Sequence, residues 1–265
     1  MLKVIDLNFL RDPNLDSFLS AGNLGVLFEY HFMEMSKGDS SLNFAKSLER
    51  ISRFPQNILI CEPVASLIQR TGIPGNVDNS SLISQPATRN FGDFCSHVAS
   101  YGNDNAKDAI FVQLTGSAKT FFVDRRSDAQ QVVSYIQRSL THLLSPDERN
   151  GLRTDKEITY ERRLWILKDA ADLTTDILRQ KGCNIPQISN CLAFRYIVAG
   201  YLLGFHWIVS GGGLDQLPAD KMVNDITDMM YVALSTYFDG ILTNEKKVNW
   251  VEKELVTTLQ YVTND

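Results

Sequence analysis

Short apolar runs that end in polar turns occur near both ends of the chain and predict buried β-strands. The first run, Leu2–Ile5, is followed by Asp6, Leu7 and Asn8, a pattern typical of a strand covered on both faces in a parallel sheet. Similar runs predict strands over residues 25–29, 57–61 and 240–243. Because Leu2–Ile5 is apolar on both sides, we expect it in the interior of the sheet.

Longer segments with apolar residues at three- and four-residue intervals predict helices. Residues 42–54 show this spacing, with Phe44, Leu48, Ile51 and Phe54 on one face. The same reasoning predicts helices over residues 15–24, 32–37, 128–144, 155–181, 188–210, 220–237 and 248–262. The periodicity is lost between about residues 72 and 105, which predicts a long irregular connection with one short helix. Residues 109–114 fit a strand or a helix equally well.

Strand-forming segments at both ends and helices between them predict an α/β fold. We expect a central parallel sheet flanked by helices, in one domain over residues 1–265. Its core would come from about residues 1–65 and 218–265. Residues 66–217 would form a mainly helical insertion or cap, a surface for a homo-oligomer or a protein partner.

The composition excludes some classes of protein but does not identify the function of this protein. The chain has 44% hydrophobic and 22% charged residues, and 26 Lys and Arg against 31 Asp and Glu give a net charge of −5. This balance excludes a strongly basic nucleic-acid coat protein but not an enzyme that acts on nucleic acid with metal ions. The four cysteines lie far apart, which argues against a zinc cluster. The apolar stretch 196–209 is too short to span a bilayer, so we expect a buried helix and a cytoplasmic protein with no membrane partner.

Carboxylates follow several of the predicted elements. One ends the first strand, one lies early in the helix after the second, two are three residues apart on one helix, and one follows the last strand. These residues are Asp6, Glu34, Asp225, Asp228 and Glu245. In open α/β sheets ligands bind beyond the carboxyl ends of the strands, so we expect these side chains to gather there. Clustered carboxylates repel one another unless a cation joins them, and Mg²⁺ or Mn²⁺ prefers such oxygens.

Four segments that carry these carboxylates resemble the acidic motifs of PIN-like nuclease domains. Val4-Ile-Asp6-Leu-Asn8 looks like the opening motif, and residues 26–38 resemble the strand and helix that bring the central glutamate, Glu34. Asn224-Asp225-Ile-Thr-Asp228 and Ile241-Leu-Thr243-Asn-Glu245 resemble the third and fourth motifs. The resemblance covers about the first sixty and the last fifty residues and leaves the middle unmatched.

The resemblance implies a PIN-like fold and a Mg²⁺- or Mn²⁺-dependent endoribonuclease. Asp6, Glu34, Asp225 or Asp228, and Glu245 would be the metal-binding and catalytic residues, with RNA as substrate. Its hydrolysis would leave a 5′-phosphate and a 3′-hydroxyl. Candidate substrate contacts are Asn8 in the opening motif, Lys246 and Lys247 beside the metal edge, and Arg195 at the start of an apolar helix.

Some positions depart from the family pattern or leave a choice open. Glu245 stands where the family has Asp, Glu29 competes with Glu34, and either Asp225 or Asp228 could face the metal. One or two metal ions could bind. Asp239 precedes the last strand, so it ranks below Glu245 as a metal ligand, and we expect it either to have a structural role or to support the ligands.

Two other functions compete with the nuclease. A haloacid-dehalogenase-like phosphatase also has an aspartate at the end of its first strand, but it needs a second aspartate where this chain has Asn8. A non-catalytic PIN-like scaffold would bind nucleic acid or protein, with Glu245 marking a weakened fourth motif.

Overall fold

The computed structural model describes residues 1–36, 41–99, 109–155, 157–210 and 219–262. The chain divides into two compact units. The first, here called the sheet unit, comprises Met1–Leu67, Asp78–Arg125 and Tyr237–Asn244. The second, the helical unit, comprises Ile68–Val77, Arg126–Thr236 and Glu245–Asp265.

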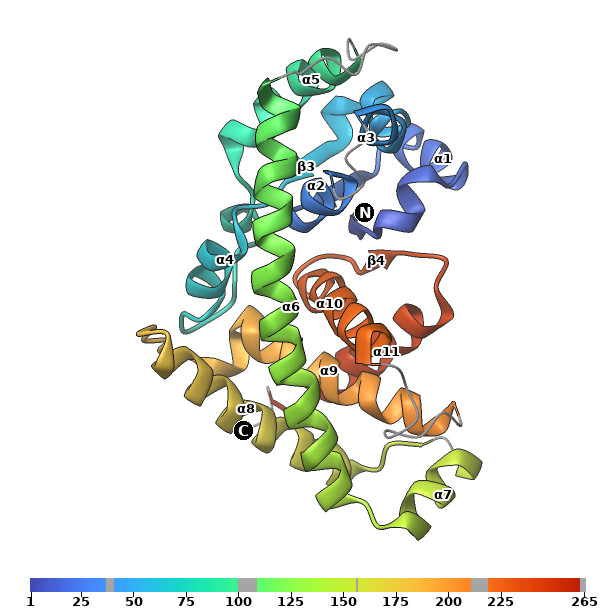
Figure 1. The fold of residues 1–265 in the computed structure, drawn as a ribbon, viewed down its shortest axis with the longest axis vertical. Coiled ribbons are helices and arrows are strands. Elements are labelled where there is room, and N and C mark those ends of the chain that lie inside the picture. The colour runs from blue at the N-terminus through green and yellow to red at the C-terminus, as the bar shows by residue number, and fades with distance from the viewer. Residues whose placement is uncertain (37–40, 100–108, 156, 211–218, 263–265) are drawn as a thin grey trace. The chain divides into compact units, whose positions relative to one another are not determined.

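A parallel sheet of four strands lies in the sheet unit (Figure 1). Its strands are β1 (Leu2–Ile5), β2 (Leu24–Leu27), β3 (Ile58–Ile60) and β4 (Ile241–Leu242). The order β3-β2-β1-β4 places β1 in the interior, which confirms the prediction from its apolar pattern. Val4 pairs with Ile241 and Ile5 with Leu242, so the two ends of the chain meet in adjacent strands.

Helices of the first half belong wholly or in part to the sheet unit. They are α1 (Asn14–Ser20), α2 (Glu29–Ser36), α3 (Ser41–Leu48), α5 (Gln85–Ala99), and the beginnings of α4 (Val64–Thr71) and α6 (Ala109–Leu143). The buried core of the sheet unit includes Ile5, Leu27, Phe44, Ile58 and Phe91. The strand expected to reach residue 29 ends at Leu27, and Glu29 begins α2 instead.

The region from 72 to 105 is more helical than its sequence pattern predicted. Helix α5 occupies residues 85–99, where an irregular connection with one short helix was expected. Phe91, Cys95 and Val98 form its buried face at helical spacing, and Pro86 lies in the first turn, where a proline is tolerated. Residues 109–114, which fitted two structures equally well, are the beginning of α6.

Helix α9 (Leu192–Val209) is the centre of the helical unit (Figure 1). It packs against α7 (Pro146–Asp155), α8 (Tyr160–Gln180), α10 (Ala219–Ser235) and α11 (Lys246–Leu259). Among the described helices only α9 has the length and apolar composition to cross a membrane, and 72% of its apolar window is buried inside the protein. This burial confirms the buried helix that the sequence pattern predicted over this stretch.

Candidate functional site

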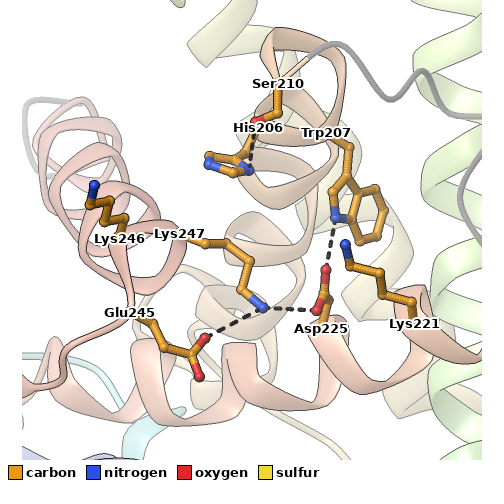
Figure 2. A pocket seen from close by; sticks show the side chains of 8 residues that line it. All are labelled: His206, Trp207, Ser210, Lys221, Asp225, Glu245, Lys246 and Lys247. Atoms are coloured by element: carbon orange, nitrogen blue, oxygen red, sulfur yellow. Dashed lines mark hydrogen bonds and ion pairs between the residues drawn. The ribbon is translucent and has the colours of Figure 1, made fainter.

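Three of the predicted acidic residues meet at one lysine in the helical unit. The ammonium Nζ of Lys247 lies 2.8 Å from a carboxylate oxygen of Asp225, 3.6 Å from Asp228 and 3.7 Å from Glu245. Figure 2 shows the ammonium between Glu245 and Asp225, with dashed lines to both. The cluster formed by Asp225, Asp228, Glu245 and Lys247 is called the carboxylate–lysine cluster below.

The local structure explains why these groups converge. Asp225 and Asp228 are three residues apart on α10, so their side chains share one face of the helix. Glu245 is the N-cap residue of α11, and Lys247 lies in the first turn of the same helix. Both helices pack against α9, and α10 and α11 also contact one another.

Asp225 is the most enclosed carboxylate of the cluster, with only 7% of its surface exposed. One of its oxygens accepts a hydrogen bond from Nε1 of Trp207 on α9, at 3.1 Å. Its other oxygen accepts from Lys247. Both oxygens are therefore satisfied, as a buried charge requires.

The charge of Lys247 is favoured by its neighbours. Desolvation by burial lowers the pKa of this lysine, but the hydrogen bond to Asp225 and the charges of Asp228, Asp225 and Glu245 outweigh it, so the pKa lies above its usual value. Three carboxylates against one ammonium leave a formal charge of −3 + 1 = −2 on the cluster.

A pocket of about 490 Å³ opens beside the cluster. Its lining residues, all drawn in Figure 2, are His206, Trp207, Ser210, Lys221, Asp225, Glu245, Lys246 and Lys247. His206 shares a hydrogen bond of 3.4 Å with Ser210, and its ring lies 5.2 Å from that of Trp250. Burial, and then the charge of Lys247, lowers the pKa of His206, so this imidazole is neutral near pH 7.

Asp6 lies in the sheet unit, at the end of β1. Its carboxylate accepts a hydrogen bond of 2.7 Å from the hydroxyl of Thr243, which directly follows β4. The pairing of Ile5 with Leu242 brings these two strand ends together. Asp6 is 9% exposed, and its side chain makes no cap hydrogen bond to the 3₁₀ helix that follows, η1 (Leu7–Arg11). The structure therefore gives Asp6 no role as a helix cap.

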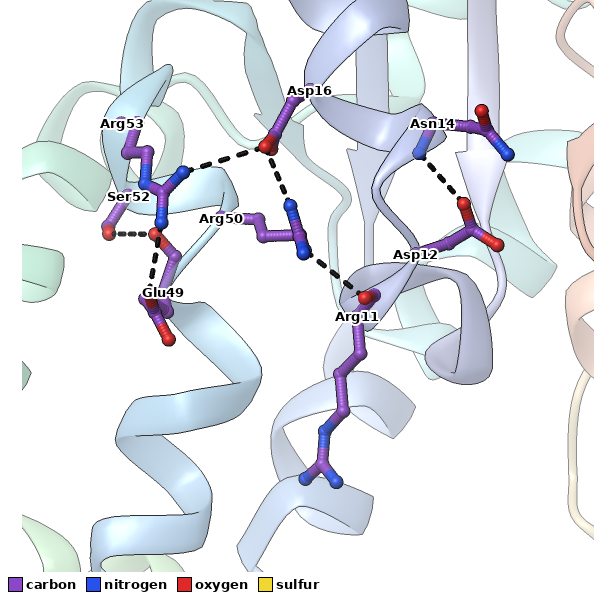
Figure 3. Close-up of polar contacts among 8 residues, drawn as sticks. All are labelled: Arg11, Asp12, Asn14, Asp16, Glu49, Arg50, Ser52 and Arg53. Atoms are coloured by element: carbon purple, nitrogen blue, oxygen red, sulfur yellow. Dashed lines mark hydrogen bonds and ion pairs between the residues drawn. The ribbon is translucent and has the colours of Figure 1, made fainter.

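The segment after Asp6 is held by the ion-pair network in Figure 3. Arg50 donates to the carbonyl of Arg11 at 3.1 Å and to the carboxylate of Asp16 at 2.6 Å. Asp12 accepts a hydrogen bond from the backbone N–H of Asn14, the main cause of the lowered pKa of this carboxyl, and a further one from Asn244. These bonds hold the two segments that follow Asp6 and Thr243.

The remaining predicted residues are more dispersed. Glu34 lies half-buried on α2, and Asn8 is exposed on η1, both in the sheet unit. Arg195 on α9 donates to the carbonyl and the hydroxyl of Thr236, at 3.2 and 2.8 Å, just beyond the end of α10. Its substrate contact stays a prediction.

Asp239 makes structural bonds at the other end of β1. Its carboxylate accepts from the backbone N–H of Leu2 at 2.7 Å, and its own N–H donates to the carbonyl of Leu2. Leu2 begins the strand that Asp6 follows, so Asp239 fixes the opposite strand end, as its position before β4 predicted.

Within the described ranges, no group of three or more His, Cys, Asp or Glu side chains has the geometry of a metal site. Lys247 explains this for the helical unit, because its ammonium lies where Asp225, Asp228 and Glu245 converge. The donor set is all carboxylate, which suits Mg²⁺ or Mn²⁺. The three carboxylates could hold such an ion once the ammonium moves out.

Part of the pocket was not predicted from the sequence. His206 belongs to the stretch 196–209, which was expected as a buried helix, but its half-buried side chain lines the pocket. Lys221 precedes Asp225 by four residues on α10, a spacing that would have indicated a shared face. No spacing in the sequence connects Trp207 with Asp225, because their contact depends on how α9 packs against α10.

Comparison with known proteins identifies no relative from which a function could be inferred. No protein-family model matches the chain, and the searches of the curated proteins and of the solved structures find no match.

Proposed function

We propose that the chain is a PIN-like, metal-dependent nuclease of the cytoplasm that hydrolyses phosphodiester bonds in RNA. The observation that carries this proposal is the convergence of Asp225, Asp228 and Glu245 within 3.7 Å of one cationic centre. Three carboxylates around one centre attract the double charge of a divalent cation more strongly than the single charge of an ammonium. The motif resemblance supplies the reaction class.

The carboxylates of the helical unit have distinct tasks in this proposal. Asp225, held by Trp207, is the most rigid ligand, while Asp228 and Glu245 are more exposed and can adjust to the ion. When bound, Mg²⁺ or Mn²⁺ activates a water molecule and neutralises charge on the phosphodiester. Water attacks phosphorus, and the bond to the 3′ oxygen breaks to leave a 5′-phosphate and a 3′-hydroxyl.

Asp6 and Glu34 are the acidic residues that the sheet unit contributes to the proposed activity. Asp6 is held by Thr243 at 2.7 Å, so its carboxylate has a defined orientation at the end of β1. Asn8, Arg195 and Lys246 are the proposed contacts to substrate.

The test is cleavage of a labelled single-stranded RNA with Mn²⁺, followed by addition of a chelator. Asp6→Asn and Asp225→Asn should each abolish cleavage while keeping the fold, because each substitution preserves size and removes a charge. Asp93→Asn on α5, an exposed aspartate, is the matched control and should cleave like the wild type. Equal cleavage by all four proteins would mean a contaminating nuclease and would overturn the assignment of the acidic residues.

The non-catalytic scaffold is a second candidate, favoured by one observation. Lys247 already provides the carboxylates of the helical unit with a cation. If this ion pair is permanent, the cluster is a structural element of a nucleic-acid or protein binding module. Calorimetry with Mn²⁺ separates the two functions: binding that is lost in Asp225→Asn supports the nuclease, and no binding by the wild type supports the scaffold.

A further inference from the structure

We propose that the pocket of the helical unit binds a phosphate group of the RNA strand, with Lys221 and Lys246 as the charged contacts. This inference deepens the proposed function and rests on it for the identity of the strand. The pocket measures about 490 Å³, enough for a phosphate and part of the attached nucleotide.

The charges of the lining residues divide into two groups. Asp225 and Glu245 are engaged by Lys247, so the negative side chains of the pocket are partly neutralised from within. Among the residues that the structure describes, no carboxylate forms an ion pair with Lys221 or Lys246, and both lysines are exposed. Figure 2 shows these two lysines on either side of Lys247. Two ammonium groups are thus available to an anion.

Neutral hydrogen-bonding groups lie between the lysines. One ring nitrogen of the uncharged His206 forms a hydrogen bond with the hydroxyl of Ser210. Figure 2 shows the other ring nitrogen on the side of Lys246. Trp250 packs against the ring of His206 and limits its movement. When Ser210 donates to Nδ1, the other ring nitrogen of the neutral imidazole carries the proton, so a phosphate oxygen can accept a hydrogen bond from this N–H as well as from the ammonium groups.

The beginning of α11 is electrostatically unfavourable without an anion. Its first turn contains Lys246 and Lys247 and no acidic residue, and the side chain of the N-cap residue Glu245 makes no cap hydrogen bond. Cations at the N-terminus of a helix oppose its dipole. The carboxylates offset this cost for Lys247, whereas Lys246 has no such partner among the described residues. Local costs of this kind are expected where function requires them.

The experiment measures binding of a labelled single-stranded RNA oligonucleotide in chelator, without metal, across a series of salt concentrations. Lys221→Gln and Lys246→Gln should each weaken binding about two- to fivefold, the range for exposed ion pairs. Each should also reduce the slope of log affinity against log salt by about 0.7, as the loss of one phosphate contact on a single strand does. Circular dichroism checks that each variant is folded.

Lys253→Gln is the matched control, because Lys253 is exposed on the same helix, α11, seven residues beyond Lys246. If Lys253→Gln weakens binding as much as the pocket variants do, or if no variant changes the affinity and the slope, the proposal is overturned. A second arm titrates inorganic phosphate. Phosphate binding that is lost in the pocket variants while RNA binding is unchanged would overturn the assignment to the RNA strand and identify free phosphate as the ligand of the pocket.

The two proposals fail in different ways. Because binding is measured without metal, an RNA that binds through Lys221 and Lys246 but is never cleaved contradicts the nuclease and keeps the pocket. An RNA that is cleaved with unaltered affinity in both lysine variants contradicts the pocket and keeps the nuclease.

Discussion

Lys247 is the residue on which the candidate site depends most directly. Its ammonium is the shared partner of three carboxylates, one of them the buried Asp225. Removing one member of a partly buried charged group leaves the others without compensation, which costs more than the pair contributes when intact. The stability of the helical unit therefore depends on which cation, the Lys247 ammonium or a metal ion, pairs with these carboxylates.

The first prediction concerns Lys247→Met, which keeps an apolar stem and removes the charge. Without metal it should lower the free energy of unfolding by about 2 kcal/mol, because Asp225 loses a charge-assisted hydrogen bond. Added Mn²⁺ should stabilise this variant more than the wild type, since no internal ammonium competes for the carboxylates. Urea unfolding with and without Mn²⁺ measures both effects. Lys253→Met on α11 is the control, and equal stability of the two variants would contradict the prediction.

His31 connects two elements that carry predicted acidic residues. Its Nε2 lies 2.5 Å from the carbonyl oxygen of Ile5, the residue before Asp6. A carbonyl can only accept, so Nε2 carries the proton, and Nδ1 of the neutral ring accepts from the backbone N–H of Phe28 at 3.1 Å. Desolvation by complete burial lowers the pKa of His31 from 6.5 to about 4.

The second prediction is a loss of stability in acid that depends on His31. The unfolded chain takes up this proton below pH 6.5 and the folded chain only near pH 4, so the contribution is complete above pH 6.5 and falls as the pH drops towards 4. The difference of 6.5 − 4 corresponds to about 3 kcal/mol. Urea unfolding of the wild type and His31→Gln between pH 7 and 4 measures it. The variant should show a smaller slope, and identical slopes would contradict the assignment.

At the scale of elements, the helical unit is held together by close contacts around α9. Gly200 on this helix faces Ile136 of α6 and Ile226 of α10, both fully buried. A methyl group at Gly200 would lie 2.7 Å from the end of each isoleucine side chain. The helices can approach this closely only because residue 200 has no side chain.

The third prediction compares two helical glycines in the same unit. Gly200→Ala should lower the free energy of unfolding by about 1 kcal/mol, because overpacking outweighs the gain in helix propensity. Gly151→Ala on α7, where an added methyl group meets nothing within 4 Å, should raise it by about 0.5–1 kcal/mol. Thermal unfolding of both variants tests the difference. A stabilising Gly200→Ala would show that the isoleucines move aside at little cost.

At the scale of the whole molecule, the predicted acidic residues are divided between two compact units. Asp6 and Glu34 belong to the sheet unit, and Asp225, Asp228 and Glu245 belong to the helical unit. The chain crosses between the units several times, since each is assembled from three separate segments. Metal binding can therefore be tested separately for the carboxylates of each unit.

The fourth prediction is metal-linked stability. At a Mn²⁺ concentration of about 100 times Kd, the wild type should gain about 2.7 kcal/mol in free energy of unfolding, and a chelator should remove the gain. Asp225→Asn and Asp6→Asn should gain much less, whereas the exposed control Asp93→Asn should gain as much as the wild type. If only Asp225→Asn loses the gain, Asp6 is not a metal ligand. If the wild type gains nothing, the metal proposal is wrong.

Local patterns in the sequence predicted two features of the fold correctly. The apolar residues of Leu2–Ile5 placed β1 inside a parallel sheet, and three-residue spacing placed Asp225 and Asp228 on one face of a helix. Both predictions depend only on the regular arrangement of side chains within one element, which determines the side chains that share a face. Helix α5 is longer than the one short helix expected between residues 72 and 105, because Pro86 and Gly92 suggested a loop although the apolar residues of α5 have helical spacing.

The contacts of the candidate site were decided by tertiary structure. Charge in the sequence indicated that the carboxylates needed a cation, but not that Lys247 would provide one or that Trp207 would hold Asp225. Those contacts join α9, α10 and α11, and they depend on how the apolar surface of α9 orients the two other helices. A repeat along one helix determines which residues share a face, whereas the face that a neighbouring helix presents depends on packing across the whole interface.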